Sequence, residues 1–157
     1  MNDAVGPGGR PNERIKPFGA LVGEWTTVST HPLLPGKVLH GRVTFDWIEG
    51  GAFLRMRSSV EGHDVPSGVA IIGSDDVADD GSMLYFDERG VSRLYRTSFS
   101  GNEWKIWRDA PGFRQRGVAV VSPAGEAIEA RWELAREGSA FEPDLEQTYT
   151  RVGARRP

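Results

Sequence analysis

Apolar and polar residues alternate along most of the chain, and the alternation breaks at short clusters of glycine, proline, asparagine and aspartate. A period of two is typical of β-strands that bury one face. We expect ten such strands, spaced roughly 8–12 residues apart as in all-β barrels and sandwiches. They are expected at residues 24–30, 38–47, 52–60, 68–74, 83–87, 91–99, 104–109, 113–121, 127–135 and 145–152.

Tight turns predict how neighbouring strands pair. Gly101-Asn102 is a two-residue hairpin signal, because both residues tolerate a positive φ. Pro111-Gly112 and Ala124-Gly125 are interpreted in the same way, although a three-residue turn at 110–112 would turn the strand at 113–121 over. The resulting pairs are Phe99 with Trp104, Thr97 with Ile106, Tyr95 with Arg108, Arg108 with Gln115, Ile106 with Gly117, Gly117 with Trp132, Ala119 with Ala130 and Val121 with Ile128. Together they place Phe99, Trp104, Ile106, Val121, Ile128, Trp132 and Leu134 on one face.

Ten antiparallel strands linked by hairpins usually close into a barrel, because closure removes exposed strand edges. We therefore predict an all-β fold, an antiparallel up-and-down barrel of about ten strands with room for a ligand. A two-sheet sandwich is the alternative. A short helical turn is expected at residues 17–22. The glycine- and proline-rich residues 1–14 are expected to be a flexible tail, residues 15–152 the barrel domain, and residues 153–157 a short basic tail.

Composition excludes several classes of protein. The 157 residues contain no cysteine, which excludes a disulfide scaffold, a thiolate metal site and a cysteine nucleophile. A net charge of −3 argues against nucleic acid or an anionic membrane as partner. No apolar run approaches the roughly 18–20 residues that span a bilayer, and the start carries no apolar signal segment. We expect a cytoplasmic protein that binds neither nucleic acid nor membrane.

The segment Gly23-Glu24-Trp25 resembles the Gly-x-Trp that opens the first strand of lipocalin-like (calycin) barrels. In that family a basic residue on the last strand packs over the tryptophan, and Arg151 stands at the matching place. A guanidinium can stack on an indole while it donates to nearby carbonyls. The segments at residues 31–36, 47–54 and 108–113 are similar to those of uncharacterised bacterial lipocalin-like proteins. The resemblance implies a barrel with an internal site and implies no single reaction.

The same face that carries the tryptophans also carries polar side chains. No inward Asp or Glu is expected on these strands, so an inward arginine would need an anionic partner. We therefore predict a pocket for a mainly apolar acid, anchored by Arg108 with help from Arg93 and Tyr95. The alternative is that these arginines lie in water at the barrel mouth or bind backbone carbonyls. The predicted ligand-binding residues are Arg93, Tyr95, Trp104, Arg108, Gln115, Trp132, Gln147 and Tyr149.

The three histidines are His31, His40 and His63, and no pair has metal-ligand spacing. Haem-binding barrels of the nitrobindin type use a histidine late in the chain, where this sequence has none. We expect no metal and no cofactor. His31 lies in a stiff apolar loop and is, with Tyr95, a candidate catalytic residue. The acidic run at residues 75–81 lacks calcium-loop spacing and is interpreted as a solvated hairpin loop.

The leading hypothesis is non-covalent binding of a small, mainly apolar molecule inside the barrel. The second is a cofactor-independent enzyme, a cyclase or isomerase, that uses the same cavity and Tyr95, Arg108 or His31. A third interpretation makes the barrel an interaction module, a homodimer joined through outward Trp107 and Val118.

Overall fold

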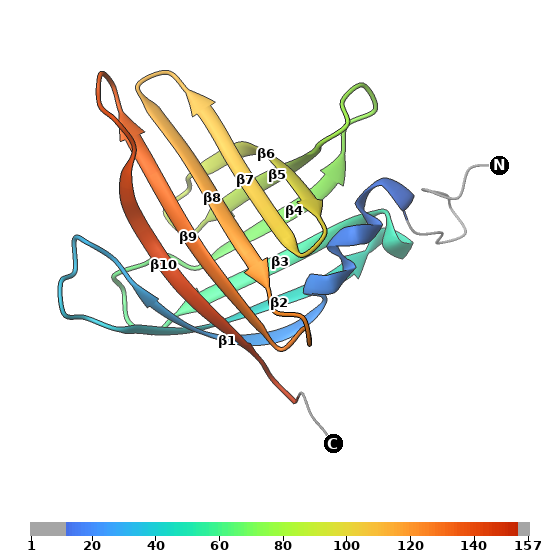
Figure 1. The fold of residues 1–157 in the computed structure, drawn as a ribbon, viewed down its shortest axis with the longest axis horizontal. Helices are drawn as coiled ribbons and strands as arrows, with labels where there is room; N and C mark the ends of the chain where they lie inside the picture. Colours follow the sequence, from blue (N-terminus) through green and yellow to red (C-terminus); the bar gives the residue numbers. More distant parts are fainter. Residues whose placement is uncertain (1–11, 154–157) are drawn as a thin grey trace.

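The computed structural model describes residues 12–153 and contains ten antiparallel strands that close into one barrel (Figure 1). Each strand pairs with its neighbours in the chain, and β1 pairs with β10 to complete the ring. The barrel prediction is therefore confirmed, and the sandwich is excluded. The strands are β1 Gly23–Thr30, β2 Leu39–Ile48, β3 Phe53–Val60, β4 Gly68–Ser74, β5 Gly81–Asp87, β6 Ser92–Ser100, β7 Glu103–Ala110, β8 Phe113–Val121, β9 Ala127–Arg136 and β10 Glu142–Arg151.

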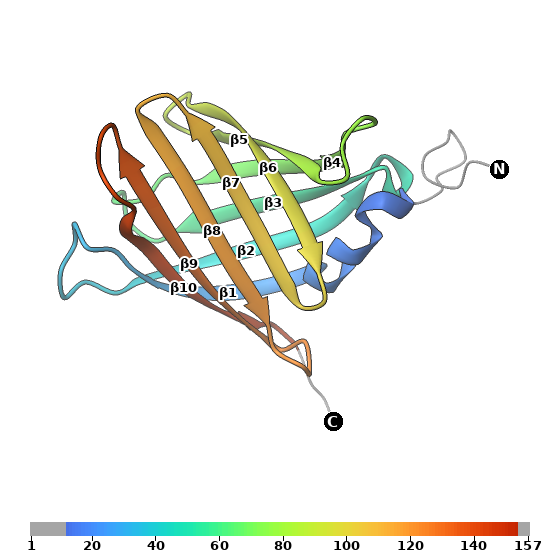
Figure 2. The same cartoon turned by 45° about the horizontal axis from the view of Figure 1, so that its top comes forward.

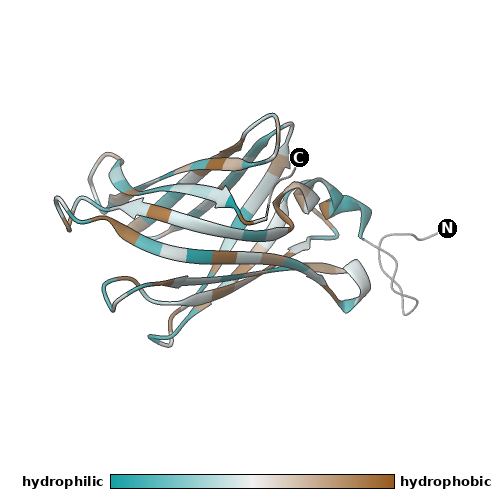
Figure 3. Cartoon of the chain, turned by 90° about the horizontal axis from the view of Figure 1, so that it is seen from below, coloured by the Kyte–Doolittle hydropathy of each residue, from teal (hydrophilic) through white to brown (hydrophobic). Residues whose placement is uncertain are grey.

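The hairpin registers agree with those expected from the turns. Phe99 pairs with Trp104, Gly117 with Trp132, and Ala110 with Phe113, so the connection at residues 111–112 is the two-residue turn. Apolar and polar residues alternate along single strands, as Figure 3 shows. The largest difference is β10, which begins three residues earlier than predicted and contains a register shift between Pro143 and Glu146.

A 3₁₀ helix, η1 Glu13–Leu21, lies across one end of the barrel (Figure 2). It buries Ile15, Phe18 and Leu21 against the core. The predicted helical turn is therefore present but longer than expected. A second short 3₁₀ helix, η2 Glu49–Gly51, connects β2 to β3 and was not predicted. Neither helix within residues 12–153 is long and apolar enough to cross a bilayer.

The boundary of the predicted flexible tail is too late. Asn12 is only 3% exposed, and its side-chain amide donates to the Ser74 hydroxyl over 2.9 Å. Its carboxamide oxygen also accepts the Arg14 backbone N–H and so caps η1. Asn12 therefore packs with the barrel and caps η1, which the polar composition of this segment did not indicate. The rest of that predicted tail, and residues 154–157 of the basic tail, lie outside the described residues.

Trp25 and Arg151 pack together at the end of the barrel beside η1. The Arg151 guanidinium carbon lies 4.1 Å from the centroid of the fully buried Trp25 ring. Its nitrogens donate to the carbonyls of Val22, Gly125 and Ala20 over 2.6, 2.8 and 3.1 Å. The arrangement expected from the family resemblance is therefore present.

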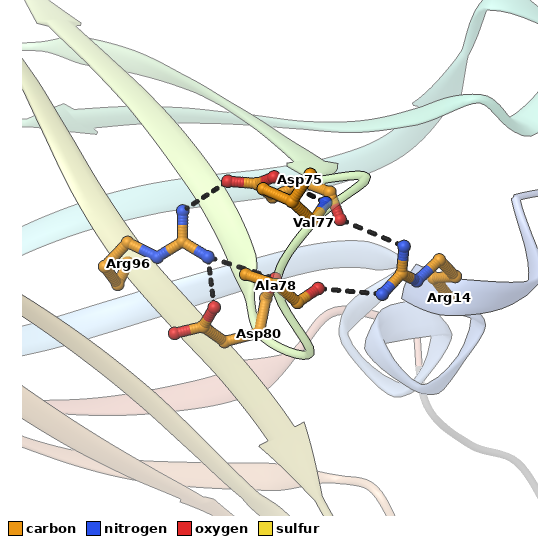
Figure 4. Close-up of polar contacts among 6 residues, drawn as sticks. All are labelled: Arg14, Asp75, Val77, Ala78, Asp80 and Arg96. Atoms are coloured by element: carbon orange, nitrogen blue, oxygen red, sulfur yellow. Dashed lines mark hydrogen bonds and ion pairs between the residues drawn. The ribbon is translucent and has the colours of Figure 1, made fainter.

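The acidic loop between β4 and β5 is bound by two arginines (Figure 4). Arg96 forms ion pairs with Asp75 and Asp80, and Arg14 donates to the carbonyls of Asp75 and Ala78. The Val77 N–H and Arg96 lower the pKa of Asp75, and the Arg96 guanidinium lowers the pKa of Asp80. The expected solvated hairpin loop is thus fastened to η1 and to β6.

Candidate functional site

An internal cavity of about 220 Å³ occupies the part of the barrel away from η1. No residue of η1 contributes to it, whereas the β3–β4 loop does, through Val65 and Pro66. The start of β10 contributes Asp144 and Leu145. This volume lies below the roughly 300–1,000 Å³ of typical drug-sized pockets, so it suits a small ligand. The other apolar residues of the lining are Val43, Met56, Val60, Ala70, Met83, Trp104, Ile106, Gly117, Val118, Ala119, Ala130 and Trp132.

The Trp132 ring lies inside the barrel because Gly117 leaves room for it. A Cβ atom at residue 117 would stand 2.8 Å from Cδ2 of the indole, closer than any real side chain allows. Tyr95 meets the same indole edge-on, with ring centroids 6.0 Å apart. Trp104 donates its indole N–H to Thr97 over 2.8 Å. The two tryptophans predicted to face inward therefore do so.

A buried side-chain amide provides the main polar feature of the wall. The Tyr95 hydroxyl donates to Oε1 of Gln115 over 3.0 Å, and Gln115 is 8% exposed. Among residues 12–153, no acceptor bonds to Nε2 of Gln115, so its two N–H groups remain available to the cavity. Gln147 donates to the Ser29 hydroxyl over 3.1 Å and lines the cavity beside Tyr149.

The two candidate arginines are placed differently. Arg93, at the start of β6, lines the cavity, and its guanidinium carbon lies 5.6 Å from the Phe113 ring centroid. Arg108 is half-buried and does not line the cavity, so the predicted anchoring role does not fit its position. The physical reason is that Tyr95 and Gln115 bond directly across β7, at the level where Arg108 pairs with Gln115. The other seven predicted residues all line the cavity: Arg93, Tyr95, Trp104, Gln115, Trp132, Gln147 and Tyr149.

The expectation of no inward acidic residue is wrong, because Asp144 lines the cavity. In β10 the register shift sets Asp144 and Leu145 together opposite the single residue Trp132. Such a bulge re-aims side chains, so both residues reach the cavity although strict alternation would turn one of them outward. Asp144 carries a carboxylate at the mouth of an otherwise mostly apolar cavity.

His31 holds Asp144 in place. Nε2 of His31 lies 2.6 Å from Oδ1 of Asp144, and the two side chains are 22% and 17% exposed. The Leu33 N–H donates to Nδ1 of His31 over 3.0 Å, so Nδ1 is an acceptor and the ring proton resides on Nε2. With both ring nitrogens engaged, His31 is not free to act as a base. It therefore orients Asp144, which is the acid–base candidate that sequence reasoning missed.

Tyr85 also lines the cavity and was not predicted. Its hydroxyl donates to Oδ2 of Asp87 over 2.7 Å, and Arg89 binds both oxygens of that carboxylate. The Arg89 guanidinium holds the pKa of Asp87 well below its usual range, and burial raises the pKa of Tyr85. Burial likewise raises the pKa of Tyr149. Both phenols are therefore neutral groups near pH 7. The alternation that places Met83 inward was the available signal for Tyr85.

The three histidines lie outside the set of described residues that line the cavity, and His40 and His63 are exposed. Within residues 12–153, no cluster of three or more His, Cys, Asp or Glu side chains could hold a metal.

No protein-family model and no curated protein matches this sequence. Among solved structures, Rv2717c from M. tuberculosis is similar, with a TM-score of 0.66 and 12% identity over 90% of this chain and 98% of that chain. The S-type phycobiliprotein lyase CPES from Guillardia theta has a TM-score of 0.58 and 11% identity, over 88% and 92% of the two chains. These likenesses establish the fold alone. The chain shares the barrel fold of these two structures, and the contact between Trp25 and Arg151 that the resemblance implied is present.

Proposed function

We propose that the barrel binds a small, largely apolar molecule in its internal cavity. The observation that supports this most directly is the buried Gln115 amide, whose N–H groups have no acceptor among residues 12–153 and face a mostly apolar cavity. Buried polar groups in folded proteins nearly always have hydrogen-bond partners. A ligand oxygen is the partner that this amide fits.

Arg93 favours a carboxylate as the source of that oxygen. Among the described residues, no carboxylate lies within ion-pair distance of its guanidinium, although it lines the cavity. A guanidinium binds a carboxylate through parallel hydrogen bonds. We therefore propose that Arg93, rather than Arg108, binds the acid group of the ligand.

The first experiment is mass spectrometry of an organic extract of the protein purified from its own host, together with an absorbance spectrum. We expect a stoichiometric small molecule. A companion titration with hexanoate and 1-hexanol, followed by the fluorescence of Trp104 and Trp132, tests the site itself. Arg93→Met should weaken hexanoate binding and spare 1-hexanol, while the exposed Arg131→Met should change neither. An empty extract together with no response to either probe would overturn the proposal.

A second candidate function is cofactor-independent acid–base catalysis in the same cavity. The observation that favours it is the Asp144 carboxylate, held by His31 through Oδ1 so that Oδ2 can accept a substrate proton. Incubation with the host's small-molecule extract should then consume one compound with wild-type protein and none with Asp144→Asn. Retention of a stoichiometric, unaltered ligand would favour the carrier instead. The cytoplasmic location and a homodimer through Trp107 and Val118 stay predictions of the sequence.

A further inference from the structure

Asp144 is a carboxylate that pairs with no Lys or Arg among residues 12–153. Its only ion-pair contact within residues 12–153 is His31, and that ring uses Nδ1 as an acceptor for the Leu33 N–H. Nε2 is therefore the ring nitrogen that donates, and its hydrogen bond goes to Oδ1 of Asp144. Lys37, the cation of the same loop, pairs with Asp64 instead.

This charge lies in a setting where a lone carboxylate is unfavourable. The Asp144 side chain is 17% exposed and shares the cavity with Leu145 and Trp132. Removing a carboxylate from water is costly unless charge and hydrogen bonds compensate it. The single bond from the His31 imidazole to Oδ1 leaves Oδ2 without a donor among the described residues. The complementary group is a cationic N–H donor.

We infer that the ligand carries a protonated amine that binds Oδ2 of Asp144. This inference rests on the proposed function, since it concerns the same cavity. The amine site lies on β10, whereas Gln115 and Arg93 lie on β8 and β6. The ligand class is therefore a small molecule with an apolar body, an amine at the Asp144 side and an oxygen acceptor at the Gln115 side.

The test compares three probes with the same six-carbon body: hexylamine, hexanoate and 1-hexanol. Binding to the full-length protein is followed by two-dimensional NMR, which reads millimolar affinities and locates each probe through the Trp132 and Gln115 side-chain signals. A charge-assisted hydrogen bond predicts that hexylamine binds about tenfold or more tightly than 1-hexanol. Asp144→Asn should remove this advantage and leave 1-hexanol unchanged. Glu146→Gln removes the same charge two residues away on the exposed side and should retain the advantage.

The outcomes separate the two proposals. Equal affinity of hexylamine and 1-hexanol for the wild-type protein would overturn the amine inference, even if Asp144→Asn does not fold. An advantage that persists in folded Asp144→Asn would overturn it as well. No cavity signal from any of the three probes would overturn the proposed function and the inference with it. Binding of 1-hexanol alone would leave the proposed function standing without the amine.

Discussion

Replacing Arg151 by methionine tests whether the closed end of the barrel supplies a large share of the folding stability. Methionine keeps an unbranched apolar stem over Trp25 but removes every donor. Three carbonyls then lose their partner, those of Val22, Gly125 and Ala20. The Trp25 ring also loses the cation that lies 4.1 Å from its centroid.

The size of the loss follows from these contacts. The bonds to Val22 and Gly125 are partly buried, and at the typical net value for an intramolecular hydrogen bond each is worth about 1 kcal/mol. The bond to Ala20 is exposed and adds little. The guanidinium–indole contact contributes about 1 kcal/mol. The total of about 3 kcal/mol corresponds to a melting temperature about 6–12 °C lower in a domain of this size.

The assay is urea unfolding followed by tryptophan fluorescence, supported by a thermal melt. Arg131→Met is the matched control, because this exposed arginine of β9 has no ion pair among the described residues and should change stability by less than about 0.5 kcal/mol. Gly23→Ala adds a second perturbation, since its Cβ would lie 2.5 Å from Nη1 of Arg151 at a φ of 132°. Part of its cost should vanish in the Arg151→Met background. If Arg151→Met and Arg131→Met are equally stable, the reasoning is refuted.

Three further predictions concern the cavity, the buried phenols and the acidic loop. Gly117→Ala forces the Trp132 ring to move, because the new Cβ would stand 2.8 Å from Cδ2 of the indole. We expect 1-hexanol to bind several-fold more weakly and the free energy of unfolding to fall by about 1–3 kcal/mol. Unchanged tryptophan emission would contradict this expectation. Burial raises the pKa of Tyr149 above its usual 10.0. Above about pH 10 the unfolded chain therefore loses a proton that the folded state keeps, and the free energy of unfolding should fall as the pH rises further. Urea unfolding between about pH 10 and 12 should show a shallower fall for Tyr149→Phe than for wild type, and identical slopes would argue against the effect. Arg96→Gln removes the ion pairs with Asp75 and Asp80, so limited proteolysis should cut the β4–β5 loop faster than in wild type. Arg57→Gln, at an exposed arginine, is the control and should be cut at the wild-type rate. Equal rates for both variants would show that Arg96 does not hold the loop.

The strand pattern and most of the cavity wall were predictable because both follow from a period of two. Once Gly101-Asn102 is a two-residue turn, Phe99 must face Trp104 and Thr97 must face Ile106. The same parity carries Tyr95 and Gln115 inward with the tryptophans, which is where they lie. Closure also follows, because β1 and β10 would otherwise be long unpaired edges.

The mouth of the barrel was not predictable by the same argument, because strict alternation fails there. The bulge in β10 brings Asp144 and Leu145 inward together, and its one local sequence signal is Pro143, since a proline in a sheet is confined to edge strands, strand starts and bulges. Arg108 has the correct parity, yet the direct bond between Tyr95 and Gln115 closes the cavity at its level. At the other end, Asn12 belongs to a helix cap within a stretch whose composition indicates a loose tail.

The two ends of the barrel differ in how completely their polar side chains are paired. Beside η1 the charged groups described above find protein partners: Arg151 binds three carbonyls, and Arg96 pairs with Asp75 and Asp80. At the cavity, in contrast, Nε2 of Gln115 and Oδ2 of Asp144 keep unused bonding capacity among the described residues. A chain selected only to fold would satisfy both ends alike, since an unsatisfied buried polar group lowers stability. The difference implies that substitutions beside η1 and substitutions in the cavity affect different properties of the protein. Arg151→Met should lower stability without weakening 1-hexanol, whereas Gln115→Leu should weaken the probes that carry an oxygen without lowering stability to the same degree.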